Sequence, residues 1–294
     1  DLPAGAIQLA VGASYRKQTN AFNVPAIALA RPDGTCGISQ EACSTPEHGD
    51  ISVKEVYFES LIPILKDLPF AYSLNVTLGS RWSDYNSFGT TTNNKYAFEW
   101  RPVEDLLLRG TIAQVFRAPN IDELFAGAAG DAPTAIDPCV GYDGQGHANA
   151  CANVPVGYKG SGLSQTTGVS SGALAAGVNL KPERGKTYDW GFVYSPHQLE
   201  GFSVNADYWS VELSDLITNL TAQTALNICY ANDSSPFCDF VHRIASGPSA
   251  GQIQYVQEPA VNLGKLKTSG VDFGFTYRLP KFEIAGHDIG QFSV

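Results

Sequence analysis

The sequence predicts an all-β protein whose antiparallel strands form a transmembrane β-barrel. Apolar and polar residues alternate with a period of two over long stretches, so each expected strand has one apolar and one polar face. Aromatic residues lie near the ends of the apolar faces, as in the aromatic girdles of membrane barrels. The connections between strands alternate between short and long, which is also typical of such barrels.

The expected strands are long. A tilted strand needs roughly 9–11 residues to cross a bilayer, and most of the alternating stretches reach that length. The alternation is clearest from Phe70 to Trp82 and from Val271 to Leu279. Nine strands are predicted, at residues 6–20, 51–64, 69–85, 92–101, 105–117, 185–195, 199–216, 262–279 and from about 289 onward.

The connections predict which end of the barrel faces outward. The short ones are 65–68, 102–104, 196–198 and 280–288, and 86–91 is of medium length. Each short one has a proline in or beside it: Pro63, Pro69, Pro102, Pro196 and Pro280. Proline suits a tight turn and cannot extend a ladder of hydrogen bonds. The connections 21–50, 118–184 and 217–261 are long. We therefore expect short periplasmic turns on one side and long extracellular loops on the other.

The six cysteines form three local pairs, each in a polar stretch of a long loop. The pairs are Cys36 with Cys43, Cys139 with Cys151, and Cys229 with Cys238. None has C-x-x-C spacing, and no histidine pair accompanies them at zinc spacing. Three disulfides formed in an oxidising compartment are favoured over free thiols, and they would pin the loops.

Composition excludes some classes of function. The net charge is −10, so nucleic-acid binding is not expected. Charged residues make up 16% of the chain, below the usual share of about 25% in soluble proteins. No run of eighteen apolar residues predicts a transmembrane helix. The polar faces carry Ser, Thr, Asn and Gly, which favours a wet lumen over the alternative of a secreted soluble β-sandwich.

One stretch carries a family resemblance. Residues 116–125 read FRAPNIDELF, in which Phe116, Arg117, Ala118, Pro119, Glu123, Leu124 and Phe125 resemble a motif of the TonB-dependent outer-membrane receptors. In that family the motif marks a strand that leaves the membrane and enters a large extracellular loop. Residues 52–65, 78–89, 179–196, 202–217 and 262–280 resemble further strands of the family, in the family's order.

The resemblance implies a fold and a transport function. The family's barrel has 22 strands around an N-terminal plug, so residues 1–294 are expected to be an internal portion of one barrel domain, without the plug or the C-terminal strands. The implied function is outer-membrane active uptake of a scarce solute, which would be a ferric siderophore, cobalamin or a saccharide. The implied partners are outer-membrane lipid, the small-molecule ligand, the TonB–ExbB–ExbD complex acting through the plug, and a surface or periplasmic lipoprotein.

No catalytic constellation, metal site or cofactor site stands out, so the protein is not expected to be an enzyme. A passive porin and a secreted soluble β-sheet binding or adhesion protein are the alternative functions. The two longest loops are the expected ligand-binding regions, and the candidate contact residues are Tyr142, Asp143, His147 and Tyr158. Aromatic rings there could stack on a sugar or on a siderophore ring.

Three further stretches carry local expectations. Asp122 and Glu123 are expected to cap or anchor the loop entry rather than bind a cation. Glu183 and Arg184 are expected to form a solvated ion pair. The segment 235–244 is expected to be a short helix packed against its own loop, and the Gly-rich run 157–177 a flexible loop.

Overall fold

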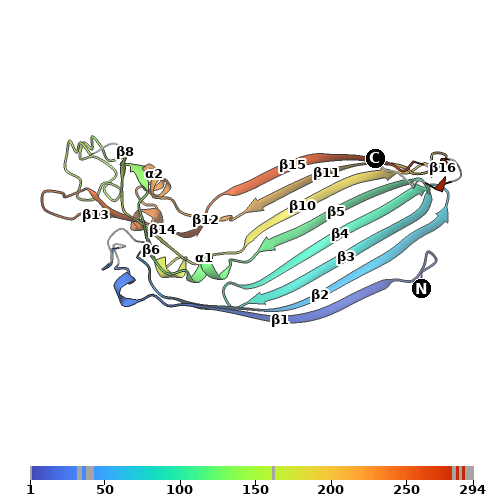
Figure 1. Ribbon diagram of the computed structural model, residues 1–294, viewed down its shortest axis with the longest axis horizontal. Coiled ribbons are helices and arrows are strands. Elements are labelled where there is room, and N and C mark those ends of the chain that lie inside the picture. Colours follow the sequence, from blue (N-terminus) through green and yellow to red (C-terminus); the bar gives the residue numbers. More distant parts are fainter. Residues whose placement is uncertain are drawn as a thin grey trace.

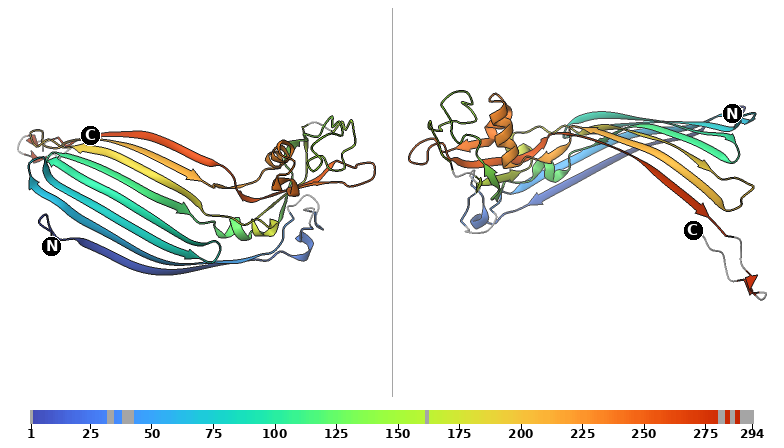
Figure 2. Two further views of the ribbon diagram at one scale, coloured as in Figure 1. Left: turned by 180° about the vertical axis from the view of Figure 1, so that it is seen from behind. Right: turned by 90° about the horizontal axis from the view of Figure 1, so that it is seen from above.

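The computed structural model describes residues 2–31, 35–37, 43–160, 163–279, 283–284 and 287–288. Its main feature is one curved, antiparallel, eight-stranded sheet with the order β1-β2-β3-β4-β5-β10-β11-β15 (Figures 1 and 2). The strands are β1 (Gln8–Phe22), β2 (Glu47–Leu68), β3 (Ala71–Tyr85), β4 (Gly89–Val103), β5 (Leu106–Arg117), β10 (Glu183–Tyr194), β11 (Phe202–Ser214) and β15 (Lys265–Tyr277).

Eight of the predicted strands are therefore confirmed. The ninth, expected from about residue 289, lies outside the described residues. Strand β2 is longer than predicted, and the ladders of β2 and β4 continue past Pro63 and Pro102. Both prolines lie at register shifts, between Pro63 and Leu65 and between Trp100 and Val103. A bulge tolerates a residue that lacks an N–H donor, so these prolines sit beside the turns rather than in them.

The two faces of the sheet differ as the alternation predicts. Val11 lies opposite Phe58, and Phe273 lies opposite Ala206, so the cross-strand register gathers apolar side chains on one face. Val11 is 69% exposed and Phe273 is 71% exposed. A continuous exposed apolar face of this kind faces lipid in a barrel, and it argues against a protein that stays soluble in water.

The opposite face, which would line the lumen, is polar and charged. Arg109 on β5 forms a bidentate ion pair with Asp207 on β11, with N–O distances of 2.9 and 2.7 Å. Lys95 on β4 contacts Glu59 on β2 at 3.2 Å. Arg81 lies over the ring of Tyr57, 5.4 Å from its centroid. These contacts cross from strand to strand and leave the charges facing a wet interior.

Short turns and long loops lie at opposite ends of the sheet (Figure 1). The turns 69–70, 104–105 and 195–201 join strands at one end. The described residues of the connections 23–46, 118–182 and 215–264 lie at the other end, together with the tight turn 86–88. The predicted asymmetry is thus confirmed for the described connections, whereas most of the expected short connection 280–288 lies outside the described residues.

The two longest loops contain a second sheet. Its order is β12-β14-β9-β6, and β13 also pairs with β14. The strands are β6 (Ala129–Asp131), β9 (Gly168–Ser171), β12 (Ile217–Asn219), β13 (Val241–Arg243) and β14 (Ile253–Asn262). The pair β7 (Thr134–Ile136) and β8 (Leu163–Gln165) forms a separate small ladder.

The remaining elements are short. The helices are α1 (Ile121–Phe125) and α2 (Ala222–Ala231), and the 3-10 turns are η1 (Ala26–Ala28), η2 (Leu174–Ala176) and η3 (Pro236–Phe240). A small ladder joins β16 (Glu283–Ile284) to β17 (His287–Asp288). Among the described residues, no helix is both long and apolar enough to cross a membrane.

Two local expectations need correction. The described residues of the run 157–177 are not simply a flexible loop, because they form β8, β9 and η2. The segment 235–244 is a 3-10 turn followed by strand β13, since the edge of β14 offers Val241 and His242 backbone partners. Its packing against its own loop is as expected: Phe237, Phe240 and Val241 contact the buried cluster around Leu226 and Val256. All three predicted disulfides are present.

Candidate ligand-binding head

The loops 118–182 and 215–264 fold together, and we call their described residues the head. Strand β9 from the first loop pairs in parallel with β14 from the second, with Gly168 opposite Val256. Gln223 of α2 exchanges hydrogen bonds with the backbone of Ile136, at 2.7 and 3.1 Å. Asn262 likewise binds both backbone groups of Lys181, at 2.8 and 2.9 Å. The head is therefore one folded unit rather than two independent loops.

The FRAPNIDELF motif builds the entry to the head. Asn120 is the N-cap of α1: its side chain accepts the Glu123 N–H at 2.7 Å, and the Glu123 carboxylate accepts the Asn120 N–H at 2.8 Å. This reciprocal arrangement is a capping box, which satisfies two otherwise unpaired donors. Arg117, the last residue of β5, contacts Glu123 at 2.9 Å and Glu183 at 2.7 Å. The predicted capping and anchoring role is confirmed for Glu123, and for Asp122 it stays a prediction.

Glu183 ties three segments together. Its carboxylate binds Arg117 and also accepts the backbone N–H of Ile217 at 2.9 Å, so it joins β5, β10 and the start of the second loop. The expected ion pair between Glu183 and Arg184 is wrong. Consecutive residues of a strand point to opposite faces of the sheet. The side chain of Arg184 therefore lies on the face opposite to Glu183 and cannot pair with it.

Apolar packing holds α1 against the lumen-facing side of the main sheet, near the end where the long loops lie. Leu124 is buried in a cluster with Ile51 and Val53 of β2, and Phe125 packs against the same cluster. The ring of Phe125 occupies the space that a Cβ atom at position 49 would need, so Gly49 lets the helix approach β2 closely. The motif thus converts the end of a strand into a fixed base for the head.

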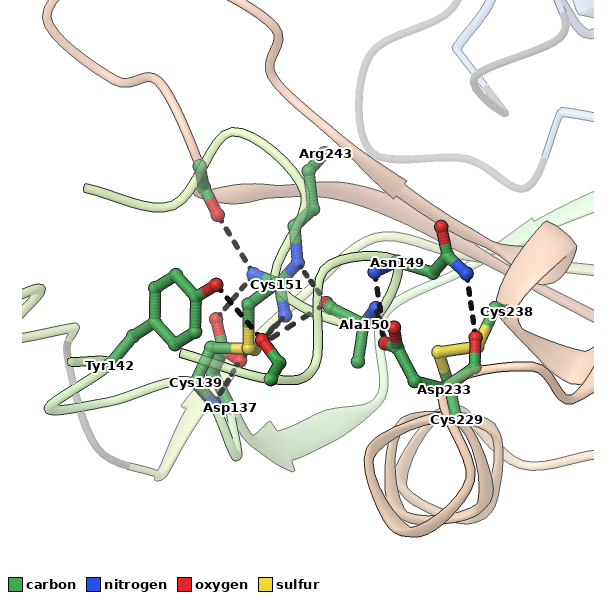
Figure 3. The surroundings of a disulfide bond; sticks show 12 residues. Asp137, Cys139, Tyr142, Asn149, Ala150, Cys151, Cys229, Asp233, Cys238 and Arg243 are labelled. Atoms are coloured by element: carbon green, nitrogen blue, oxygen red, sulfur yellow. Dashed lines mark hydrogen bonds and ion pairs between the residues drawn. A yellow bond between two sulfur atoms is a disulfide. The ribbon is translucent and has the colours of Figure 1, made fainter. Parts of the chain in front are cut away.

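A buried ion pair lies at the centre of the head (Figure 3). Arg243 of β13 donates to both carboxylate oxygens of Asp137, at 2.7 and 2.8 Å. It also donates to the carbonyls of Ala150 and Gly251, each at 2.8 Å, and contacts the Cys139 sulfur at 3.2 Å. Because these partners come from both loops, one side chain connects the cystine of the first loop to the sheet of the second.

A second polar contact joins the loops nearby (Figure 3). The Asp233 carboxylate accepts the backbone N–H groups of Asn149 and Ala150, both at 2.9 Å, and the Asn149 side chain donates to the Asp233 carbonyl at 2.7 Å. The hydrogen bond from Ala150 holds the pKa of Asp233 below its ordinary value. The ionised carboxylate is therefore the form that fits this contact.

Glu258 sits at the start of helix α2. Its carboxylate accepts the N–H of Ala222, the first residue of the helix, at 2.6 Å. A carboxylate in this position interacts favourably with the helix dipole. Burial nevertheless raises the pKa of Glu258, and the Ala222 hydrogen bond opposes that rise only in part.

The four residues predicted to bind ligand lie in the first loop near the Cys139–Cys151 disulfide. Tyr142 packs against that cystine cluster and donates its hydroxyl to the Gly146 carbonyl at 3.0 Å. Tyr158 packs on the same cluster, and the Gly141 N–H donates to its carbonyl at 2.6 Å. The structure thus brings the two tyrosines together, with their rings committed partly to packing.

The other two predicted residues have different surroundings. Asp143 is exposed, and its carboxylate accepts the N–H of Gln145 within the same turn, at 2.9 Å. His147 stacks on Tyr230 of α2 with ring centroids 4.0 Å apart. Its Nδ1 atom is buried and has no hydrogen-bond partner among the described residues. His147 therefore contributes to the contact between the two loops.

Two hollows in the head could receive a ligand. One of about 580 Å³ is lined by Tyr158, Lys159, Gln165 and Gln252, among others. Burial raises the pKa of the Tyr158 hydroxyl, so it stays a neutral donor there at neutral pH. The other, of about 570 Å³, is lined by residues of both loops, including Asn149 and His242. Within the described part of the chain, no group of three or more His, Cys, Asp or Glu residues could hold a metal ion.

Sequence reasoning missed the residues that assemble the head. Asp137, Asp233 and Arg243 were not singled out, although Asp137 and Asp233 lie close to cysteines and Arg243 follows an apolar run. A lone arginine beside Phe240 and Val241 signals a buried cation that needs a partner. The sequence does not say which carboxylate that partner is.

The fold and its surfaces together define a class of protein. A curved antiparallel sheet with an apolar outer face, a polar inner face, and long loops at one end is part of a transmembrane β-barrel. The family model described as "TonB dependent receptor-like, beta-barrel" matches residues 2–293. The chain belongs to the TonB-dependent receptor β-barrel family, whose members are transporters. A search of curated protein sequences finds no match.

Solved structures of similar fold include proteins described as receptors or transporters. A mutant of the ferric enterobactin receptor of Pseudomonas aeruginosa, in complex with enterobactin, aligns with a TM-score of 0.59 and 16% identity over 94% of this chain and 31% of that chain. The siderophore receptor PirA of Acinetobacter baumannii gives 0.57 and 13% over 92% and 32%. The FrpB iron transporter of Neisseria meningitidis gives 0.51 and 16% over 95% and 32%. This chain therefore spans about a third of their length, and at these identities the likeness is one of fold.

Proposed function

We propose that residues 1–294 form part of the barrel domain of an outer-membrane receptor that binds a scarce solute at its extracellular loops and imports it with TonB-coupled energy. Family membership supports the class of function. The observation that carries the binding role is the head itself. Two long loops are joined by a parallel strand pair and a buried ion pair, so they present a preformed surface instead of flexible chains.

We propose a ferric siderophore as the first candidate ligand, with cobalamin and saccharides as the other classes. Structural neighbours named as ferric enterobactin and siderophore receptors support that order. Tyr158 is the best placed of the candidate contact residues, because it lines a hollow and keeps its hydroxyl protonated. Asp143 is exposed and also belongs to the first loop, while Tyr142 and His147 would act mainly by holding the surface in shape.

The proposed partners follow from the same function. They are outer-membrane lipid around the apolar face, the TonB–ExbB–ExbD complex acting through a plug, and a surface or periplasmic lipoprotein.

The test uses the full-length receptor in cells that lack their other siderophore receptors. Uptake of radioactive iron bound to purified siderophores is measured with and without a proton uncoupler. Saturable uptake that the uncoupler abolishes supports the proposal. Uptake that is linear in concentration and insensitive to the uncoupler would indicate a passive porin instead. Absence of uptake for every siderophore, with saturable uptake of cobalamin or a saccharide, would reassign the ligand class.

Contact by Tyr158 is tested separately by equilibrium binding. Tyr158→Phe removes the hydroxyl and keeps the packing of the ring. We expect it to weaken ligand binding by about 1 kcal/mol, the usual contribution of one hydrogen bond. Tyr72→Phe, at the turn end of the lipid-facing side, is the matched control and should leave the affinity unchanged. Equal affinities for wild type and Tyr158→Phe would remove Tyr158 from the binding site.

A further inference from the structure

The head is strongly acidic. Residues 118–182 and 215–264 contain nine Asp and Glu residues but only three Lys and Arg residues, so their formal charge is −6, out of −10 for the whole chain. Five of these acidic residues are exposed and take part in no ion pair within the described part of the chain: Asp122, Asp131, Asp143, Asp215 and Asp239. The surface of the head therefore carries a negative potential.

Few cations offset this charge. Arg243 is buried, and its nitrogens are already bonded within the head. Lys159 and Lys181 are the other two basic residues of the two loops. Lys159 lines the hollow of about 580 Å³, which we call the first hollow, whereas Lys181 lines a different one beside Ser87. Among the described residues that line the first hollow, Lys159 is the only Lys or Arg.

The first hollow suits neutral polar groups. Most of its polar lining consists of amides and hydroxyls, from Tyr158, Ser164, Gln165, Thr166 and Gln252. The Asp137 carboxylate also lines it, and Arg243 binds both of its oxygens. Amides and hydroxyls can donate to and accept from neutral groups of a ligand, but they carry no charge that would balance a polyanion.

Asp131 lies beside the first hollow. It precedes Ala132, whose carbonyl accepts the side-chain amide of Gln165, a lining residue, at 3.4 Å. The charge of Asp131 acts on a neighbouring carboxyl group, because burial raises the pKa of Glu258 and Asp131 adds to that rise. The Debye length in physiological salt is about 8 Å, so a carboxylate this close to a bound ligand is only partly screened.

Asp143 lies close to the same hollow along the first loop. It follows Tyr142, whose carbonyl accepts the Gly157 N–H at 2.8 Å. Gly157 in turn precedes Tyr158, which lines the hollow. Asp131 and Asp143 are therefore two unpaired carboxylates near one candidate site.

The second hollow, of about 570 Å³, has the same character. Asp233 and Asp239 line it, and none of its described lining residues is Lys or Arg. An anionic ligand would therefore meet carboxylates in either hollow, and like charges brought together at an interface oppose binding.

Ferric siderophores differ in charge according to the groups that hold the iron. Each hydroxamate group carries one negative charge, so three of them neutralise the ferric ion. Each catecholate group carries two, so a complex with three of them is strongly anionic. The charge of the head therefore separates these two classes of ligand.

We propose that the head binds ferric siderophores of the hydroxamate class, whose iron centre is neutral, and discriminates against catecholate complexes. This inference rests on the proposed uptake of ferric siderophores and adds the charge of the ligand to it. Asp131 and Asp143 act as specificity-determining residues that repel an anion. The amides and hydroxyls of the first hollow bond to the neutral carbonyl groups of the ligand.

The test uses ligands that hold iron through the same hydroxamate groups and differ in charge at one end. Ferric desferrioxamine B has a terminal ammonium group and is a cation, its N-acetyl derivative is neutral, and its N-succinyl derivative is an anion. Equilibrium binding to the full-length receptor in detergent is followed by quenching of tryptophan fluorescence. We expect the dissociation constant to rise about threefold at each step of this series. Ferric enterobactin, a catecholate complex, should bind more weakly than all three, and added salt should reduce the differences.

The variant is Asp131→Asn with Asp143→Asn, which removes two charges and keeps an acceptor oxygen for the backbone of each turn. It should tighten binding of the N-succinyl derivative about threefold, weaken binding of the cation by a similar factor, and leave the N-acetyl derivative unchanged. A purely structural role of the two residues would instead change all three affinities in the same direction. The matched control is Glu104→Gln, an exposed residue in the turn 104–105 at the opposite end of the sheet, which should keep the affinities of wild type.

The outcomes separate this inference from the proposed function. Binding of the N-succinyl derivative as tight as that of the cation, or tightest binding of ferric enterobactin, would overturn the charge inference and leave siderophore uptake standing. Unchanged affinities in the double variant would also overturn it, because Asp131 and Asp143 would then not determine specificity. If none of the ferric complexes binds, the proposed siderophore function is wrong as well.

Discussion

Arg243 and Asp137 are 106 residues apart and form the most buried ion pair among the described residues, with side chains 2% and 9% exposed. Every nitrogen of the guanidinium has a partner within the head. A buried pair of this kind costs desolvation of both charges, and its main effect is to make one arrangement of the chain far better than its alternatives. Here that arrangement is the one in which the loops 118–182 and 215–264 pack together as the head.

Arg243→Met should loosen the head by about 3–5 kcal/mol, because it leaves the Asp137 carboxylate buried without its counter-ion. Hydrogen exchange should rise in residues 129–171 and 241–262 and stay unchanged in β2 and β3. The double variant Arg243→Met with Asp137→Leu should recover most of the loss, since no buried charge remains. A double variant as unstable as the single one would show that packing, not the charge, is responsible.

Asn120→Ala should destabilise α1 by about 1 kcal/mol, the usual cost of removing an N-cap side chain. The substitution removes the Asn120 side chain that accepts the Glu123 N–H and keeps the backbone N–H of residue 120 that donates to the Glu123 carboxylate. Glu123 also contacts Arg117. The measurement is protection of the Glu123 and Leu124 amides against hydrogen exchange. Asn120→Asp, which keeps an acceptor oxygen, is the control and should retain protection. Equal protection in the Ala variant would mean that burial of Leu124 alone holds the helix.

We expect the head to lose stability in acid because of Asp233. Its pKa is lower in the folded state than the ordinary value of 3.8, so its contribution is complete above that value and is lost as the pH falls through the folded pKa. In Asp233→Asn, the part of the head's stability that depends on acid should vanish, and the head should be less stable than wild type at pH 7. The measurement is the rate of proteolysis of the head between pH 2.5 and 6. Asp143→Asn, which removes a carboxylate bonded only within its own turn, should behave as wild type.

We expect Glu258 to give the stability of the head the opposite dependence on pH. Its pKa is raised in the folded state above the ordinary value of 4.5, so the folded head takes up this proton first and gains stability as the pH falls through the folded pKa. Glu258→Gln keeps an acceptor for Ala222 and should not show that gain. The readout is exchange of the α2 amides between pH 7 and 4.5, corrected for intrinsic rates. Glu200→Gln, in the exposed turn 195–201, is the control. An identical pH profile for Glu258→Gln and wild type would contradict the assignment.

Phe273→Lys tests which face meets lipid. A lysine on the lipid side of a barrel costs about 2–4 kcal/mol near the bilayer midplane and less toward the interfaces. Thr276→Lys, three residues along the same strand and on the opposite face, should cost far less because its ammonium group stays in water. The free energy of unfolding in vesicles, measured by urea titration, compares the two. A greater loss for Thr276→Lys would reverse the assignment of the faces.

Much of the barrel could be predicted because the side chains within one strand already show which of its faces is apolar and which is polar. Side chains at alternate positions face lipid or lumen, so the sequence from Val271 to Leu279 shows its two faces without reference to any other segment. The ends of the strands depend on more than the local pattern. Pro63 and Pro102 predicted the ends of ladders, whereas bulges let the strands continue past them.

Residue order alone sets the strand periodicity, the asymmetry of turns and loops, the three cystine pairs, and the capping role of the FRAPNIDELF segment. Each of these depends on residues close together in the chain. Folding in three dimensions brings Arg243 to Asp137, and Glu183 to Arg117 rather than to Arg184. Those contacts depend on cross-strand register and on loops meeting in space, where the partner of a charge is chosen by geometry and not by its distance along the chain.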